Sequence, residues 1–158
     1  MPATKLKQFL DANGVRYVSI QHSPAFTAQE IAASAHIPGR ELAKTVMVKL
    51  DDRLAMAVLP ATKKLDTELL ERASGARKAQ LATEKEFLDT FPDCEPGGMP
   101  PFGNLYGMEV YSDEQLAQDE MIAFNAGSHA ELIQLAYGDF VRLVKPKVAP
   151  LAFEYALH

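Results

Sequence analysis

Lys44 is the ionisable residue whose surroundings in the sequence most clearly suggest chemistry. It lies within an otherwise apolar run, residues 42–50, which is typical of a buried strand. The two-residue period of a strand places Lys44 on the same face as Val46 and Val48. An ammonium group on an apolar face is costly unless it reaches water or holds an anionic or carbonyl partner. The pattern therefore leaves two interpretations, a binding lysine and a lysine at a strand end that reaches solvent.

A second candidate is the glycine- and proline-rich segment PGGMPPFG, residues 96–103. Glycine tolerates unusual backbone dihedrals and proline fixes φ near about −65°, so the segment should form a shaped, semi-rigid loop. Such a loop can aim its amides at an oxyanion or a carbonyl oxygen. An ordinary connection between a helix and a strand explains the same composition.

Two histidines could take part in the same site. His129 ends the run NAGSH, residues 125–129, where Gly127 can bring the backbone close to a ligand and where a hairpin turn is an equally good explanation. His22 follows the first predicted strand. Either ring could position a water molecule or a ribose hydroxyl, and either could be a plain surface residue. Cys94 has no base linked to it by any motif, so we interpret it as a spectator thiol.

Composition narrows the classes of function. The 158 residues are 47% hydrophobic and 23% charged, which predicts one globular domain over residues 1–158. The net charge of −5 gives no general attraction to nucleic acid, so any RNA contact needs a local basic patch. The candidate basic groups are Arg40 with Lys44 and Lys49, Lys63 with Lys64, Arg72 with Arg77 and Lys78, and Arg142 with Lys145 and Lys147. A single cysteine, no signal segment and no apolar run of membrane-spanning length predict a cytoplasmic protein without a membrane contact.

Common catalytic motifs are missing from the sequence. It contains no P-loop, no HExxH, no GxSxG and no CxxC, which removes the usual phosphoryl-transfer, zinc and serine-hydrolase interpretations. The sequence thus offers no recognisable metal or cofactor motif, and the predicted site includes neither.

The elements that must position these residues follow from periodicity and caps. Strands are predicted at 16–21, 42–50, 54–59, 78–81, 108–111, 121–125 and 131–135. Helices are predicted around Leu6 to a stop at Gly14, and at 28–35, 66–73, 83–91 and 138–144, with capping boxes at Thr27 with Glu30 and at Thr83 with Glu86. The sum is an α/β or mixed α+β domain. We expect a mostly antiparallel mixed β-sheet, or a partial barrel, flanked by helices.

These pieces, in this order, resemble the YbaK and prolyl-tRNA-synthetase-associated domain family, the free-standing relatives of the editing insertion of bacterial prolyl-tRNA synthetase. The resemblance is carried by HSP at 22–24, AQEIA at 28–32, AKTV at 43–46, LPA at 59–61, GGMPPFG at 97–103 and FNAGS at 124–128. Each piece is weak alone, while the ordered set is fairly specific.

The resemblance implies an enzyme that hydrolyses the ester between a small, wrongly attached amino acid and the terminal adenosine of tRNA, without a metal. It implies that Lys44 is the essential lysine and that residues 97–101 are the family's GxxxP loop. It leaves open whether the aminoacyl group is alanyl, cysteinyl, seryl or threonyl. The implied partner is the 3′ aminoacyl end of a mischarged tRNA, with an aminoacyl-tRNA synthetase as a further candidate.

A mechanism on these residues assigns orientation and charge stabilisation to the protein. Lys44 would hold the terminal phosphate or ribose, loop amides would cradle the carbonyl oxygen, and the ribose hydroxyl or His129 would activate water. We expect the hairpin face with Val46, Val48, Met56 and Val58 to line a pocket. The predicted catalytic residues are Lys44, Gly97, Gly98 and Pro101, and the predicted substrate contacts are His22, Val46, Met56, Phe102, Gly103, Gly127, Ser128 and His129. The alternatives are a binding module that cleaves nothing and a hydrolase of other small esters.

Overall fold

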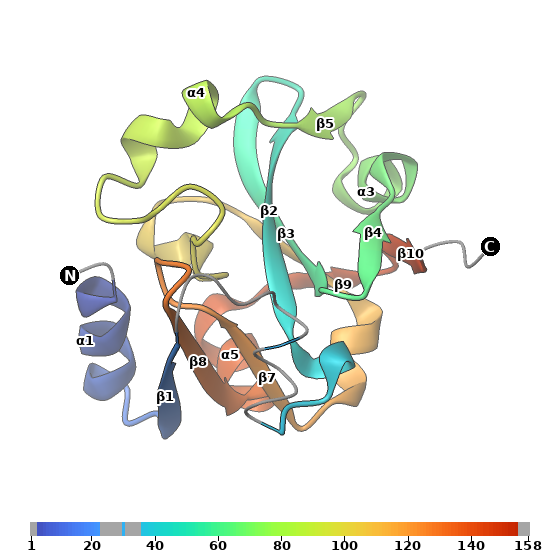
Figure 1. Ribbon diagram of the computed structural model, residues 1–158. Helices are drawn as coiled ribbons and strands as arrows, with labels where there is room; N and C mark the ends of the chain where they lie inside the picture. The colour runs from blue at the N-terminus through green and yellow to red at the C-terminus, as the bar shows by residue number, and fades with distance from the viewer. Residues whose placement is uncertain (1–2, 23–29, 31–35, 155–158) are drawn as a thin grey trace.

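The computed structural model describes residues 3–22, 30 and 36–154. The predicted helix at 28–35 and its Thr27 capping residue lie outside this part of the chain, apart from Glu30. In chain order the elements are α1 (Thr4–Ala12), β1 (Tyr17–Gln21), β2 (Ala43–Leu50), β3 (Arg53–Pro60), β4 (Lys63–Leu65), α3 (Thr67–Ser74), β5 (Ala79–Leu81), α4 (Glu84–Phe87), β6 (Val110–Asp113), β7 (Met121–Asn125), β8 (Glu131–Ala136), α5 (Tyr137–Val144), β9 (Lys147–Ala149) and β10 (Ala152–Glu154). The arrangement confirms the expected mixed α+β class (Figure 1).

A five-stranded sheet in the order β5-β2-β3-β6-β9 forms the centre of the molecule. The pairs β5/β2 and β2/β3 are antiparallel, whereas β3/β6 and β6/β9 are parallel. The β2–β3 hairpin turns in two residues, because Leu50 pairs with Arg53. The sheet ends in β5 on one side and β9 on the other, so it is open, and the partial-barrel alternative does not describe it.

A second, antiparallel sheet has the order β1-β8-β7. It approaches the first sheet where Leu42, just before β2, bridges to Ala123 in β7. A two-stranded pair, β10 with β4, completes the described strands. Figure 1 shows α1 beside β1, and α5 packed against β8.

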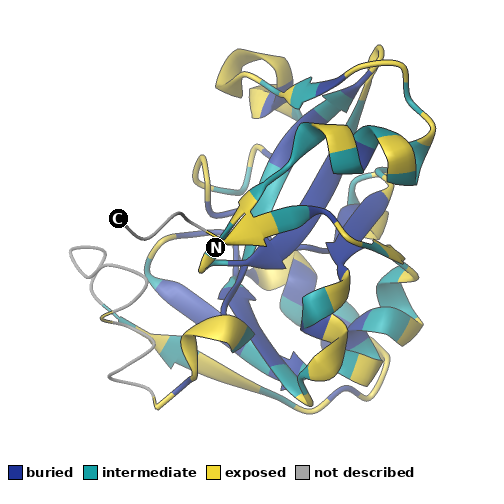
Figure 2. Ribbon diagram, turned by 90° about the vertical axis from the view of Figure 1, so that its right-hand side faces the viewer, coloured by how far each residue is buried: buried dark blue, intermediate teal, exposed yellow. Residues whose placement is uncertain are grey.

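Two hydrophobic clusters lie on opposite faces of the five-stranded sheet. Alternate residues of β2 divide between them: Ala43 and Met47 belong to the larger cluster, while Val48 and Leu50 belong to the smaller one. The larger cluster also receives residues from α1, α5 and the three-stranded sheet, and the smaller one is covered by α3 through Leu70. Figure 2 shows this buried band running through both sheets, with exposed residues concentrated on helices and turns.

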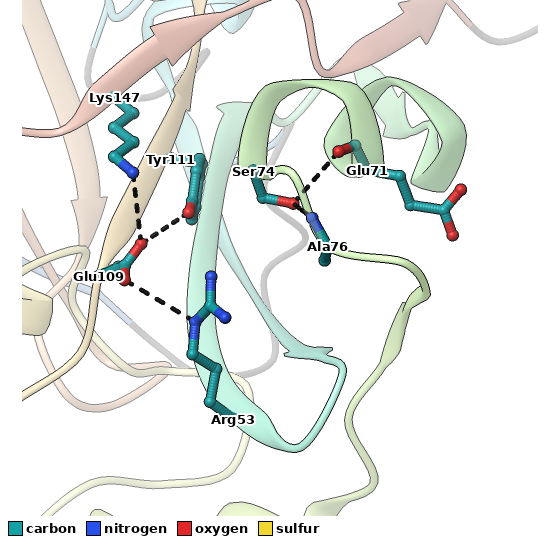
Figure 3. Close-up of polar contacts among 7 residues, drawn as sticks. All are labelled: Arg53, Glu71, Ser74, Ala76, Glu109, Tyr111 and Lys147. Carbon is teal, nitrogen blue, oxygen red and sulfur yellow. Dashed lines mark hydrogen bonds and ion pairs between the residues drawn. The ribbon is translucent and has the colours of Figure 1, made fainter.

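Glu109 ties three strands of the large sheet together at its parallel side (Figure 3). Tyr111 in β6 donates to its carboxylate at 2.6 Å, and Arg53 in β3 and Lys147 in β9 each lie 3.7 Å from it. The hydrogen bond from Tyr111 is the main reason that the pKa of Glu109 is lowered. The same view shows the end of α3, where the Ser74 hydroxyl bonds to the backbone around it.

Local signals fix both ends of α3 and the start of α4. Asp66 caps α3 by accepting from two amides, and Gly75, with φ of 78°, ends the helix. The capping box of Thr83 and Glu86 that opens α4 is present, as predicted. The short strands β4, β9 and β10 were not predicted. No helix in the described residues is long and apolar enough to cross a bilayer.

Candidate active site

A tight turn at residues 95–98 begins the glycine-rich segment. The amide of Gly98 donates to the carbonyl oxygen of Glu95 at 2.9 Å, and Gly97 has a φ of 80°. Proline at the second position and a glycine with positive φ at the third are the signature of a type II turn. The sequence therefore dictates this turn locally.

The turn is hydrogen-bonded to the connection between β7 and β8. The amide of Glu95 donates to the carbonyl oxygen of Gly127, and the amide of Gly127 donates to that of Gly98, both at 2.8 Å. In Figure 1 the segment that follows α4, in yellow, passes next to the orange turn between β7 and β8. Two of the regions singled out in the sequence are thus held side by side.

Gly98 is required at this junction by close approach. A Cβ atom at Gly98 would lie 3.0 Å from backbone atoms of Ser128, which cannot move away cheaply. The side chain of His129 lies on the same junction: its Nε2 is 2.8 Å from the carbonyl oxygen of Pro96, and its amide donates to Glu95 at 3.4 Å. Glu95 was not predicted as a site residue, and only its position before the turn could have suggested it.

An apolar pocket of about 250 Å³ lies between this turn and β2. Its lining residues are Thr45, Val46, Met47, Leu81, Ala82, Phe87, Gly97 and Met99. Lys44 is the neighbour of Thr45 in β2 and is half-buried, but it does not itself line the pocket. The pocket wall from β5 and α4 was missed in the sequence, where the capped helix with Phe87 on it was the available signal.

An ion pair holds α4 over β2. The ammonium of Lys49 lies 2.9 Å from the carboxylate of Glu86. The backbone hydrogen bond at Thr83, followed by the contact with Lys49, lowers the pKa of Glu86 to about 2. Phe87, the next residue, lines the pocket.

The expected pocket wall of four hairpin residues is wrong. Residues directly opposite in an antiparallel pair share a face, and Val46 pairs with Ala57 while Met56 pairs with Met47. Val46 and Val48 therefore lie on one face, and Met56 and Val58 lie on the other. Val46 does line the pocket, whereas Met56 is fully buried in the larger cluster.

The second half of the glycine-rich segment belongs to the core and not to an accessible surface. Phe102 is fully buried among the rings of Phe9, Phe124 and Phe140. A Cβ at Gly103 would lie 2.7 Å from Val110, so this glycine is explained by packing. Pro101 is also buried. Packing alone therefore accounts for Phe102 and Gly103, and their contact with substrate stays a prediction.

The amides of this segment are not all available to a ligand. The amide of Gly98 is used within the turn, and Pro100 and Pro101 have none. The amides of Gly97 and Met99 make no hydrogen bond among the residues described, and both residues line the pocket. Two donors therefore lie at the pocket edge.

The remaining predicted contacts cluster at the same turn. The amide of His22 donates to the carbonyl oxygen of Ala130, which extends the β1/β8 pairing by one residue and brings His22 beside the turn. Ser128 is buried, and its hydroxyl accepts from the amide of Ala130. Gly127 is buried with a φ of 97°.

Cys94 is not activated as a nucleophile, and the described residues offer no metal-binding group. Burial raises the pKa of the Cys94 thiol, whose sulfur lies 3.6 Å from the hydroxyl of Tyr106. A raised pKa disfavours the thiolate that a nucleophile needs. Within residues 3–22, 30 and 36–154, no three histidine, cysteine or acidic side chains are grouped as a metal site would require.

The chain is similar to known proteins in both sequence and fold. Proline–tRNA ligase of Macrococcus caseolyticus (strain JCSC5402) is 25% identical over 130 residues, which is 75% of this chain and 22% of that enzyme, so the chain spans about a fifth of this relative. A solved structure described as a candidate trans-editing enzyme for prolyl tRNA synthetase has a TM-score of 0.83 at 20% identity and covers 96% of this chain and 97% of its own. The structure of hypothetical protein APE2540 gives the same TM-score and identity, over 94% of this chain and 99% of its own. The model of the aminoacyl-tRNA editing domain matches residues 22–143, and the chain therefore belongs to the aminoacyl-tRNA editing domain family.

Proposed function

We propose that the protein is a deacylase that hydrolyses the ester of a small, wrongly attached amino acid on the 3′ end of tRNA. The observation that carries the proposal is the junction of residues 95–98 with residues 127–129 at the edge of an apolar pocket. The family match supports the same conclusion. The fold likeness to a candidate trans-editing enzyme agrees with a protein that acts apart from a synthetase.

The chemistry asks for orientation and charge stabilisation more than for a strong base. An aminoacyl ester is already reactive, and preorganised donors lower the barrier where negative charge develops. The amides of Gly97 and Met99 are the donors for the carbonyl oxygen. Lys44, one residue from the pocket wall, holds the terminal phosphate or the ribose. The neighbouring ribose hydroxyl or His129 activates the attacking water.

The pocket walls favour a small aliphatic aminoacyl group. Among the lining residues that the structure describes, Thr45 provides the one polar side chain, and the other side chains are aliphatic, aromatic or thioether. A hydroxyl placed there without a partner loses its hydration at a cost of about 1–3 kcal/mol. Among alanyl, seryl, cysteinyl and threonyl groups, we expect alanyl esters to be cleaved fastest.

A panel of mischarged tRNAs tests this function. Purified protein is incubated with alanyl-, seryl-, cysteinyl- and threonyl-tRNA, and loss of the ester is followed over time. Lys44→Ala should abolish deacylation while its thermal unfolding stays near that of the parent. Arg16→Ala, at an exposed cationic residue just before β1, is the control and should keep full activity.

Each contrary outcome has a definite meaning. Full turnover by Lys44→Ala would reject the role of Lys44. Binding of aminoacyl-tRNA without ester loss would favour a binding module, and cleavage of small esters independent of the tRNA body would favour a general esterase. Pull-down of a synthetase with the intact chain would test the proposed synthetase partner.

A further inference from the structure

The turn beside His129 selects one tautomer of its neutral ring. Its Nε2 lies 2.8 Å from the carbonyl oxygen of Pro96. A carbonyl oxygen accepts and cannot donate, so Nε2 must carry the proton in this contact. A neutral imidazole has one protonated nitrogen, and the lone pair therefore lies on Nδ1.

The carbonyl that selects this pattern is itself fixed. Pro96 is the second residue of a turn closed by the bond from Gly98 to Glu95, and that turn is bonded on both sides to Gly127. The carboxylate of Glu95 reaches back to accept from the amide of His129. The ring and its acceptor thus lie on two segments that Glu95 joins through both its backbone and its side chain.

We infer that His129 serves the deacylation through Nδ1 and that Glu95 is a positioning residue for that ring. The inference rests on the proposed function. It adds the atom that accepts the proton, Nδ1 of His129, and the residue that positions the ring, Glu95. As water attacks the ester carbon, its proton passes to Nδ1. The bond from that carbon to the ribose oxygen then breaks, and the ribose oxygen takes the proton back. The products are the free amino acid and the tRNA with its terminal hydroxyl restored.

The ring nitrogens can be observed without any substrate. In the intact, ¹⁵N-labelled protein at alkaline pH, a long-range ¹H–¹⁵N spectrum should give His129 a pyridine-type shift at Nδ1 and a pyrrole-type shift at Nε2. A proton found on Nδ1 overturns this inference alone. Absence of deacylation across the whole tRNA panel overturns the proposed function, and with it the catalytic part of the inference, whatever the ring shifts are.

Two substitutions at His129 separate the two nitrogens. In His129→Asn, the side-chain oxygen occupies the position that Nδ1 has in the histidine ring. In His129→Gln, the side-chain amide nitrogen occupies the position that Nε2 has in the ring. We expect His129→Gln to keep the contact with Pro96 and to lower kcat by about 10²- to 10⁴-fold, as loss of general-base help does. We expect His129→Asn to retain at least about tenfold more activity than His129→Gln. Higher activity in His129→Gln than in His129→Asn would assign proton transfer to Nε2 and reject the inference.

The role of Glu95 is tested by a conservative pair. Glu95→Ala removes the acceptor for the His129 amide and should lower kcat by about two- to tenfold, with KM nearly unchanged and with the Nε2 signal moving toward an average of the two protonation patterns. Glu95→Gln keeps an acceptor oxygen and should restore both readouts. Glu68→Ala, at an exposed glutamate on α3, is the control. Unchanged ring shifts and rate in Glu95→Ala would remove Glu95 from the positioning role.

Discussion

The two halves of residues 95–103 differ in what they contact. Residues 95–97 are exposed, and the turn that they form with the buried Gly98 exchanges hydrogen bonds with the connection between β7 and β8. Met99 is buried and lines the pocket, and residues 100–103 are buried in the core, with Phe102 among three other rings. One half shapes the site and the other anchors it. A short glycine–proline motif can therefore combine two tasks that composition alone does not separate.

The largest effect should come from the buried half. Phe102→Ala removes a fully buried ring and should lower the free energy of unfolding by about 3–5 kcal/mol, measured by urea denaturation. Phe153→Ala, at a half-exposed ring in β10, should cost much less. Equal losses in the two variants would contradict the division between an anchoring half and a surface half.

A smaller loss is expected where the surface half meets its neighbour. In Gly98→Ala the new Cβ lies 3.0 Å from the backbone of Ser128, so the two segments must separate. We expect a loss of about 1–3 kcal/mol in unfolding free energy together with most of the deacylation rate. Gly138→Ala in α5 meets nothing within 4 Å and should leave both unchanged or raise stability slightly. A fully active Gly98→Ala protein would show that the junction is not needed.

Gly97→Ala should act on activity more than on stability. A positive φ costs a residue with a Cβ about 1 kcal/mol, and the same cost applies to Gly14→Ala, where φ is 67° and nothing lies within 4 Å. The Gly97 methyl would also lie 3.4 Å from the His129 ring. Similar melting curves for the two variants, with activity lost only at Gly97, would confirm the surface half as the functional one. Loss of activity at Gly14 would argue for a general effect of strain.

The contribution of Glu86 in α4 to the free energy of unfolding should depend on pH. The pKa of Glu86 is lowered from 4.5 to about 2 in the fold, by the Thr83 amide first and by Lys49 next. Its stabilising contribution is therefore present above about pH 4.5 and is lost as the pH falls toward 2. Glu86→Gln should flatten the pH dependence of unfolding in this window. An unchanged profile would show that the Glu86 carboxylate, through its contacts with Thr83 and Lys49, does not stabilise the fold.

Long periodic elements were predictable from the sequence, and long-range placement was not. The strand β7 and the capping box of Thr83 and Glu86 follow from local patterns and were confirmed. The short strand β9 has its place only because β6 offers a parallel edge, which no local signal reports. The face of the sheet on which Met56 lies was predicted wrongly, because it depends on the register set by the two-residue turn after Leu50.

The site shows the same division. The type II turn at Pro96 and Gly97 is written in adjacent residues, whereas its bonds to Gly127 and His129 join segments some thirty residues apart. No local pattern marks Glu95, and its contacts with Gly127 and His129 exist only once the two segments lie together in the fold. The role of Lys44 stays a prediction from the resemblance until the deacylation assay is done.

The parallel side of the large sheet has a consequence for biosynthesis. The neighbours of β3 on that side are β6 and then β9, and β9 is encoded almost ninety residues after β3. The amide of Leu151, between β9 and β10, also donates to the buried carboxylate of Asp113. A nascent chain leaving the ribosome can close the β2–β3 hairpin early, but the edge of β6 is covered only after Lys147–Ala149 have been synthesised. A ribosome-stalled fragment ending before Lys147 should therefore be sensitive to protease until translation resumes.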